Sequence, residues 1–463
     1  MITLRHIYTV LFIVGLFFIP FNNFEGLSFL GEYKNEAASY FFLIGFVVLC
    51  VESMFKGSIN LPYQNIVFQT VCLFVLWTIL ATLFNLPTVL DSYYKQTSGI
   101  SRFIRQLISL ILSAFIFFSL FWNVVRNMTL EQILLTIRKT LLIGLLFAFV
   151  YSVFEIAIVV YGISQLLPIL NLFEFFPFLN VELNNMNRIS SVTYEVPALG
   201  NYLITISAWM FSYIITEKNK IRFVPTVMVL ILMFFSGSRT ALINVLLQLI
   251  IFLCVLFLKK EYRQHVIKIG LGSAILLATI FIFNSKAIIT TVEKKIEALN
   301  FTKKTDHDIS NRTRFGMQYA SLQVFKQNPI VGVGLGQETY HKVYLYPYWS
   351  THNNWEFKHR YKNQQITSFP PAYNIYTRLL AETGIIGISI FISMIALCWY
   401  QSFKIWNNNS NKTQGVLSLI LFISFVGLSV NWLQADFFRQ YGIWLSIAIL
   451  IKLSMTQTLN EKS

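Results

Sequence analysis

The sequence predicts an all-α polytopic membrane protein with about 12 transmembrane helices and one large external loop. Of its 463 residues, 55% are hydrophobic and only 12% are charged, whereas a soluble domain carries about 25% charged residues. A helix needs roughly 20 apolar residues to cross a bilayer. Segments of this kind occur near 5–22, 38–55, 64–85, 103–125, 140–163, 196–216, 222–237, 240–258, 266–284, 379–400, 414–432 and 438–455. The length therefore indicates a helical bundle in lipid rather than several soluble domains.

A long polar stretch interrupts this pattern after the ninth apolar segment. Residues 285–373 form a predicted periplasmic loop, which separates helices 1–9 (1–284) from helices 10–12 (374–463). The stretch from Lys286 to Tyr373 holds twelve of the 36 Lys and Arg residues and four of the six histidines. A membrane protein meets a hydrophilic substrate in a soluble insert of this kind, so we expect the function to involve it.

The basic residues predict the orientation of the bundle. With a cytoplasmic N-terminus, the short inner loops and the termini hold sixteen Lys and Arg residues, and the short outer loops hold eight. This excess follows the positive-inside rule. We therefore expect both termini in the cytoplasm and the insert outside. Residues 1–24 mimic a secretory signal, but no small-x-small cleavage site follows, so we interpret them as a retained helix. The net charge of +15 is spread through short loops, which argues against a nucleic-acid partner.

Metal and redox chemistry are not indicated. The cysteines (Cys50, Cys72, Cys254 and Cys398) lie inside apolar segments without a C-x-x-C pair, as small hydrophobic residues do. No His-x3-His pair or Cys/His cluster occurs. We therefore expect no disulfide, metal or cofactor.

Six of the eight basic residues on the outer short loops are arginines. A guanidinium binds phosphate or carboxylate through two parallel hydrogen bonds, so this face is predicted to hold an anionic ligand. Contact with lipid headgroups is the alternative. Arg188 leads into the sixth apolar segment, where Glu195 and Pro197 also form an ordinary helix start. Arg239 lies in the polar turn 236–240 between two apolar helices. An arginine between two apolar helices is energetically costly unless it pairs with another group or lines a water-filled cavity.

The insert offers further candidates. Arg312 and Arg314 alternate near its middle and are either ligands for a diphosphate or solvated. Residues 340–361 interleave Tyr and Trp with Asn, His and Lys, which suits stacking on sugar rings but is also typical of a membrane-interface belt. His352 is a candidate general base within this run. The glycines of 331–336 lack the spacing and βαβ context of a dinucleotide site. At the end of the insert, a polar stripe recurs every four residues on one helix face, formed by Asn374, Arg378 and Glu382. If they point inward, these three residues border the cavity beneath the insert and are candidates for binding the substrate. Alternatively, Arg378 and Glu382 pair only with each other.

These motifs resemble the O-antigen polymerase/O-antigen ligase superfamily of integral membrane glycosyltransferases. The similar segments are RISSVTYEVPALGNYL (188–203), FFSGSRTALI (234–243), NPIVGVGLG (328–336) and AYNIYTRLLAETGIIG (372–387). The resemblance implies glycan transfer from an undecaprenyl-pyrophosphate carrier at the periplasmic face of the bacterial inner membrane, in lipopolysaccharide biosynthesis, without a metal. It implies that Arg188 and Arg239 bind the pyrophosphate and stabilise it as leaving group, with Arg312 and Arg314 as further candidates.

One departure from the family pattern guides the choice within it. Ligase-like members have His-Asn at the start of the last motif, with the histidine as the base, and this chain has Tyr373 before Asn374. We therefore favour a polymerase and expect His352 to be the base, with Glu195 second. The expected partners are lipid-linked donor and acceptor glycans, membrane lipid and a chain-length regulator protein. The alternatives are a ligase acting on lipid A-core or protein, a lipid-linked glycan transporter or flippase, and a non-enzymatic export scaffold.

Overall fold

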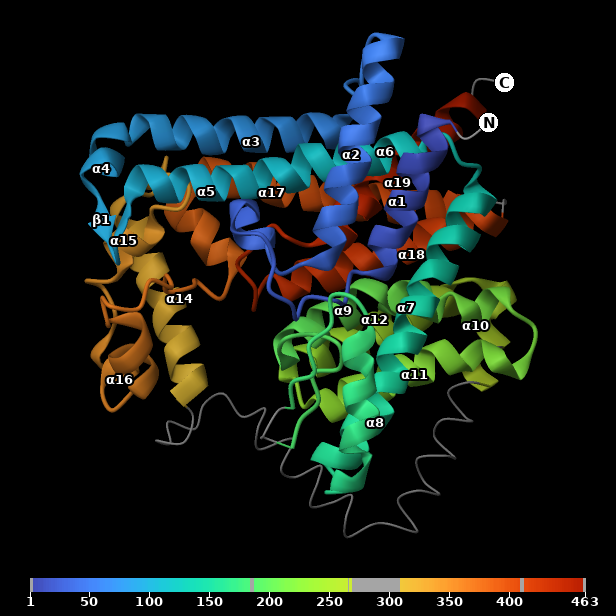
Figure 1. The fold of residues 1–463 in the computed structure, drawn as a ribbon. Coiled ribbons are helices and arrows are strands. Elements are labelled where there is room, and N and C mark those ends of the chain that lie inside the picture. The colour runs from blue at the N-terminus through green and yellow to red at the C-terminus, as the bar shows by residue number, and fades with distance from the viewer. Residues whose placement is uncertain (1–2, 184–186, 265, 269–308, 409–411, 461–463) are drawn as a thin grey trace.

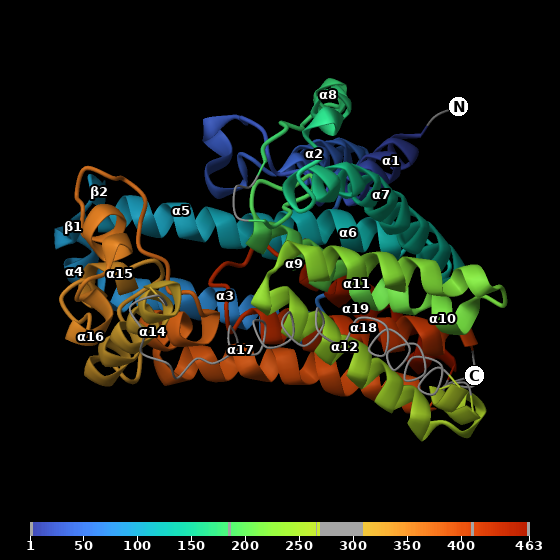
Figure 2. The same ribbon diagram turned by 90° about the horizontal axis from the view of Figure 1, so that it is seen from below.

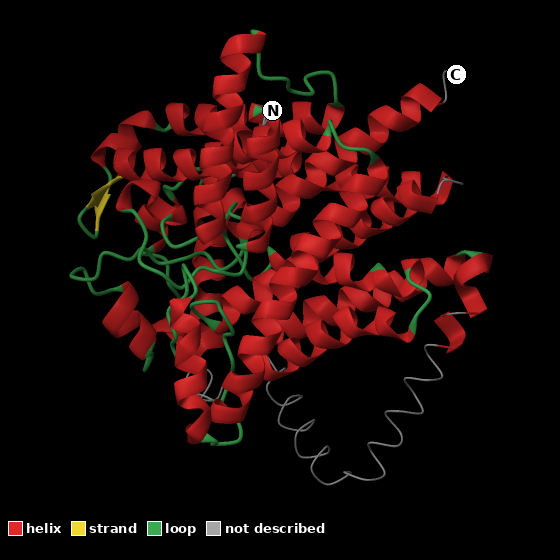
Figure 3. Cartoon of the chain, turned by 45° about the vertical axis from the view of Figure 1, so that its right-hand side comes forward, coloured by secondary structure: helices red, strands yellow, loops and turns green. Residues whose placement is uncertain are grey.

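The described residues form a bundle of helices with one β-hairpin, whose two strands have two residues each (Figures 1 and 3). The structure, a computed structural model, describes residues 3–183, 187–264, 266–268, 309–408 and 412–460. The predicted all-α, multi-pass class is confirmed. The first part of the insert, up to residue 308, lies outside the described residues.

The chain before the insert forms the following elements. They are α1 (Leu4–Phe17), the 3₁₀ turn η1 (Ser28–Tyr33), α2 (Ala37–Lys56), α3 (Ile66–Phe84), α4 (Leu86–Asp91), β1 (Tyr93–Tyr94), β2 (Thr97–Ser98), α5 (Gly99–Ile111), the π-helical turn η2 (Leu112–Phe117) and α6 (Phe118–Val125). There follow α7 (Leu130–Val159), η3 (Ser164–Leu166), α8 (Leu167–Asn171), η4 (Leu172–Phe175), α9 (Val196–Phe211), α10 (Tyr213–Thr216), η5 (Lys220–Phe223), α11 (Val224–Ser236) and α12 (Arg239–Leu258). Strands β1 and β2 pair antiparallel.

The rest of the chain is helical as well. The insert contributes α14 (Ile309–Gln327), α15 (Glu338–Lys342), α16 (Tyr348–Thr351) and the π-helical turn η6 (Glu356–Tyr361), and α17 (Ile375–Asn408), α18 (Lys412–Asn431) and α19 (Tyr441–Asn460) follow it. The described part of the predicted loop is therefore folded. Its own small core consists of Met317, Phe357 and Tyr361. Helix α14 packs against α17.

Eight helices of the described residues are long and apolar enough to cross a membrane, fewer than the 12 predicted. They cover 37–55, 66–84, 99–125, 130–159, 196–216, 239–258, 375–408 and 412–431. Helices α1, α11 and α19 coincide with three further predicted spans. However, α1 and α11 have only 14 and 13 residues, short of the roughly 20 that a bilayer requires. The predicted span 266–284 lies outside the described residues beyond position 268.

Helix α17 is broken where it meets the insert. Gly384 has a φ of 63° inside the helix, and a Cβ there would lie 2.1 Å from the carbonyl oxygen of Ile330. The backbone of the glycine-rich segment 329–334 binds the groups that the break exposes: the Ile385 N–H donates to Pro329, and the Gly334 N–H donates to Glu382. Backbone groups at membrane depth need such partners. The end of the insert is thus built into the bundle.

The two ends of the bundle differ. In Figures 1 and 2, α1 begins and α19 ends on the right, whereas α4, α15 and α16 lie on the left. Between these ends, apolar side chains are exposed on the outer faces of the spans, for example Ile44, Val47 and Val51 of α2. Such patches suit a lipid environment. The start of α1 and the end of α19 therefore lie opposite α15 and α16 of the insert, and the assignment of their side to the cytoplasm is a prediction from the basic residues.

Candidate functional site

A polar cavity of about 910 Å³ lies between the insert and the bundle. Its charged lining consists of Glu32, Lys34, Glu36, Arg188, Glu195, Arg239, Arg314, Glu356, Arg360, Asp436 and Arg439. Amides and hydroxyls complete the wall, among them Asn201, Asn311, Tyr361, Tyr373, Asn431 and Gln434. Four side chains that the sequence singles out, from three distant parts of the chain, line this one cavity. Its volume falls in the usual range for ligand sites, roughly 300–1,000 Å³.

The turn between α11 and α12 positions the first two arginines. Gly237 ends α11 in the left-handed region with a φ of 62°, which glycine adopts without the strain of a Cβ. Ser238 then caps α12 by accepting the Ala241 N–H at 3.3 Å. The Arg188 side chain lies over Gly237, because a Cβ there would be 3.1 Å from its Cγ. Arg188 therefore packs on the turn that starts the helix of Arg239.

The start of α9 lies against the same turn. Gly200 allows this approach, since a Cβ there would be 3.3 Å from the Ser238 Oγ. The N-terminal ends of α9 and α12 both contribute to the cavity wall, and helix N-termini favour bound anions. Glu195 is the exposed N-cap residue of α9. Burial and the neighbouring Glu195 carboxylate raise the pKa of Tyr194.

The insert supplies a third arginine through α14. Arg314 donates to the Gln434 Oε1 at 3.3 Å, and its guanidinium carbon lies 5.2 Å from the centre of the Tyr373 ring. A cation over an aromatic face gains about 0.5–1 kcal/mol. From the same helix, the Asn311 Oδ1 accepts from Arg239 at 3.5 Å. Helix α14 therefore contacts the turn of Arg239 and adds a cation of its own to the cavity.

An ion-pair cluster contributes Glu32, Glu36 and Arg439 to the wall. Arg439 binds Glu36 at 2.7 Å and Glu32 at 3.6 Å, and Arg102 lies 3.8 Å from Glu32. Burial raises the pKa of Glu36. For Glu32, burial acts in the same direction, but the charges of Arg439 and Arg102 outweigh it and lower the pKa. Arg439 is committed to these carboxylates, so it is less available to a bound anion than the first three arginines.

Tyr373 adopts a strained backbone conformation at the junction of insert and bundle. Its φ is 57°, and a non-glycine residue in such a region costs about 1–3 kcal/mol unless its surroundings hold it there. The Asp436 carboxylate does so by accepting the N–H groups of Ala372 and Tyr373. The Tyr373 hydroxyl lies 2.6 Å from that of Tyr361, and burial raises its pKa. The hydroxyl therefore keeps its proton and acts as a hydrogen-bonding group rather than as a base.

Two predicted residues of the insert do not line the cavity. Arg312 donates to the backbone oxygens of Trp349 and His352, because α14 is a helix and residues two apart on a helix point in different directions. The exposed His352 ring stacks on Tyr348, whose hydroxyl lies 2.8 Å from its Nδ1. Arg314 therefore reaches the cavity, while Arg312 binds the backbone of the insert.

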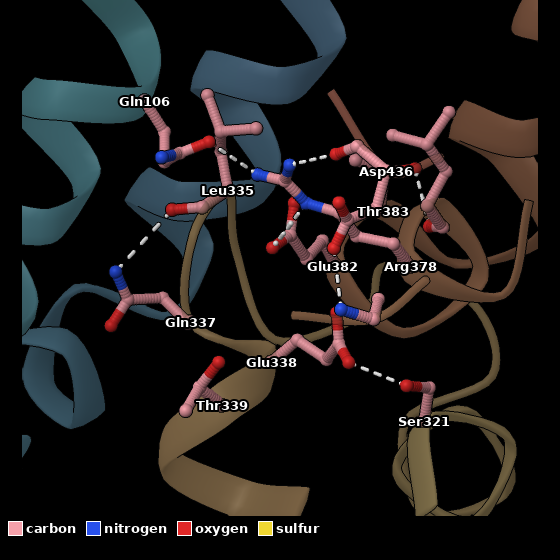
Figure 4. A network of polar contacts seen from close by, with 12 residues as sticks. Gln106, Ser321, Leu335, Gln337, Glu338, Thr339, Arg378, Glu382, Thr383 and Asp436 are labelled. Atoms are coloured by element: carbon pink, nitrogen blue, oxygen red, sulfur yellow. Dashed lines mark hydrogen bonds and ion pairs between the residues drawn. The ribbon is translucent and has the colours of Figure 1, made fainter. Parts of the chain in front are cut away.

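The polar stripe at the start of α17 is also buried outside the cavity. The Asn374 Oδ1 accepts the Tyr376 N–H at 2.9 Å and caps the helix. Arg378 pairs with Glu382 at 3.1 Å, which is the pairing alternative, and donates to Gln106 at 2.6 Å. Figure 4 shows this pair beside Gln337 and Glu338 of the insert. These side chains hold α5, α17 and the insert together.

The structure adds residues that the sequence did not single out. Arg439 appears in the sequence only as one of the basic residues of the outer loops, and Glu32, Glu36 and Asp436 carry no motif. The signal available for them is the pair of glutamates in the outer connection around 32–36 and the Asp and Arg in the outer connection 436–439. Tyr373 had a clearer signal, since it replaces the histidine of the resembling motif.

The arrangement suits charge stabilisation and proton transfer. Three arginines and two helix N-termini supply positive potential, and Glu195 is an exposed carboxylate in the same cavity. Within the described ranges, no three His, Cys, Asp or Glu side chains gather as a metal site requires.

One family comparison bears on this site. Residues 224–392 match the model of the family described as O-antigen ligase, Wzy_C. The match runs from α11 to the middle of α17, so it includes Arg239, Arg314 and Tyr373. No curated protein matches the chain.

Proposed function

Because residues 224–392 form an O-antigen ligase domain, of an integral membrane family that includes polymerases and ligases, we propose that this chain polymerises undecaprenyl-pyrophosphate-linked oligosaccharide repeat units. It works on the periplasmic side of the bacterial inner membrane, with both termini in the cytoplasm. The observation that carries the proposal is the convergence of Arg188, Arg239 and Arg314 with Glu195 on one cavity.

The arginines are proposed to bind the pyrophosphate of the donor. Arg188 and Arg239 belong to neighbouring elements at the Gly237 turn, and Arg314 approaches from the insert. No carboxylate among the described residues lies within 4.0 Å of any of the three, so their charges are available to a ligand. Charge-assisted bidentate hydrogen bonds suit a diphosphate. The helix N-termini of α9 and α12 add to the positive potential.

The reaction transfers the donor glycan to a hydroxyl group of the acceptor repeat unit. The acceptor oxygen forms a bond to the anomeric carbon of the donor, while the bond from that carbon to the phosphate oxygen breaks. Undecaprenyl pyrophosphate leaves with the electron pair, and the acceptor proton passes to Glu195. We now favour Glu195 over His352 as this base, because Glu195 lines the cavity and His352 does not. The arginines stabilise the charge that develops on the leaving group.

Two features support a polymerase over a ligase. Tyr373 replaces the histidine that ligase-like members carry in the resembling motif. The described lining has five carboxylates and no histidine, which suits a carboxylate base. A transporter of the same lipid-linked glycans is the competing class, and it would use the arginines without the carboxylate.

The deciding experiment supplies the purified protein in nanodiscs with a synthetic lipid-linked repeat unit. A polymerase produces a ladder of products with this substrate alone. A ligase produces a transfer product only after lipid A-core or an acceptor protein is added. Movement of the substrate across a liposome membrane without any new glycosidic bond would refute the enzyme proposal.

A further inference from the structure

Glu155 is a buried carboxylate that the proposed reaction does not use. It lies near the end of the span α7 and its exposed fraction is 0%. Its Oε1 accepts the Ser190 N–H at 2.9 Å, and its Oε2 accepts the Ser191 N–H at 2.8 Å. No Lys, Arg or His among the described residues lies within 4.0 Å of it. The carboxylate is therefore compensated by backbone N–H groups.

Such a group is costly in a membrane helix. An ionisable side chain inside a span normally pairs with an opposite charge or serves the function, and burying it without compensation is strongly unfavourable. A glutamine would fill the same volume at lower desolvation cost. The fold gains from the carboxylate what an amide cannot give, namely two acceptor oxygens for two consecutive backbone donors.

The donors belong to the segment that carries Arg188. Two of its non-glycine residues have left-handed backbones: Asn187, with a φ of 52°, and Ser191, with a φ of 55°. Residues in this region persist when their surroundings hold them, and they cluster at functional sites. The Ser191 Oγ donates to the Ala148 oxygen of α7 at 3.0 Å, and the Ile189 N–H donates to the Phe235 oxygen of α11 at 3.3 Å. Arg188 lies between the two strained residues.

We propose that Glu155 is a positioning residue, which fixes the segment 187–195 and thereby sets Arg188 over Gly237 and Glu195 at the cavity. The inference rests on the proposed function of Arg188. Helix α7 contributes no side chain to the cavity lining. In this proposal it holds two of the proposed reacting side chains in position.

The test replaces Glu155→Gln and measures both the segment and the reaction. The amide offers one acceptor and turns a donor toward the second backbone N–H. Hydrogen exchange of the peptides covering 187–195 is expected to accelerate about tenfold or more, because one of the two backbone N–H groups loses its acceptor and the segment opens more often. The kcat/KM for the lipid-linked donor is expected to fall up to about 100-fold, as small misplacements of a binding group do. In the double variant with Arg188→Ala, the two losses are expected to be less than additive, because part of the effect of Glu155 acts through Arg188.

The matched control is Tyr151→Phe, one turn earlier on α7. Tyr151 is equally buried, and its hydroxyl has no hydrogen-bond partner within the described chain, so this variant keeps wild-type exchange and activity. Unchanged exchange in Glu155→Gln overturns the positioning role. Additive losses in the double variant also overturn it, because Glu155 would then act apart from Arg188. If Arg188→Ala retains full activity while Glu155→Gln accelerates exchange, the function proposed for Arg188 fails instead.

Discussion

Replacing Arg239 gives the sharpest test of the cavity. Arg239 is half-buried at the first position of α12, and its contact with Asn311, at 3.5 Å, is long for a hydrogen bond. Its guanidinium can therefore still bind a ligand. Arg239→Ala removes that charge while Ser238, which caps the helix, stays in place. We expect the variant to fold and to lose chain elongation.

The size of the loss follows from the local electrostatics. A unit charge 4 Å from a phosphate contributes about 4 kcal/mol at an effective dielectric constant near 20. Loss of one preorganised donor at a developing negative charge lowers kcat by about 10²–10³. We expect a fall in this range for Arg239→Ala, since Arg188 and Arg314 remain. Arg239→Lys keeps the charge but loses the planar fork, so its fall is about 10- to 100-fold.

The assay measures product ladders from a lipid-linked repeat unit at equal amounts of folded protein. Arg105→Ala is the matched control, because Arg105 is exposed on α5 and does not line the cavity. It should elongate at the wild-type rate. A wild-type ladder from Arg239→Ala would remove this residue from the mechanism, and an equal loss in Arg105→Ala would show a general need for surface charge.

Three further predictions concern the base and the stability of the fold. Glu195→Gln should reduce turnover by about 10²–10⁴ with little change in donor binding, measured as kcat and KM, because it removes the proton acceptor; an unchanged kcat would exclude it as the base. Glu382→Ala should lower the free energy of unfolding by about 3–5 kcal/mol, measured in denaturant titrations, because Arg378 is left buried without its carboxylate; Glu356→Ala, at a half-buried position of the insert, is the control. Burial lowers the pKa of His341, so on acidification the unfolded chain binds a proton at a higher pH than the folded chain does. The contribution of His341 to stability should therefore be constant above about pH 6.5 and fall below it by at most about 1.4 kcal/mol per pH unit. His341→Gln should remove this part of the pH dependence, measured by thermal unfolding.

The sequence was sufficient for the features that depend on local pattern. Apolar length places eight of the twelve predicted spans on described helices that are long enough to cross a membrane. Arg188, Glu195 and Arg239 stand next to predicted helix starts, so their shared position at one end of the bundle follows from the topology. It was insufficient where packing decides. Nothing in the local sequence distinguishes Arg312 from Arg314, but the helical twist of α14 turns only Arg314 to the cavity.

Packing also decides which charges are available. The stripe of Asn374, Arg378 and Glu382 has the spacing of a helix face, but the sequence does not say what covers that face. Gln106 of α5 and the backbone oxygen of Asp436 bind Arg378 there, whereas the segment 329–334 meets the backbone of α17 at the break at Gly384. Likewise, the pairing of Arg439 with Glu36 joins residues 403 positions apart, which no local pattern reveals.

The insert forms part of the cavity wall. Arg188 and Arg239 lie on the bundle side, and α14 supplies Arg314 together with the Asn311 contact to Arg239. A diphosphate spreads its charge over several oxygens, so two adjacent guanidinium groups from one side leave part of that charge unbound. The third guanidinium comes from the insert, and Tyr373, which the Asp436 carboxylate holds in a strained conformation, lies at the junction of insert and bundle. The position of α14 against the bundle therefore completes the proposed anion site, which ties the large polar insert to the chemistry proposed for the bundle.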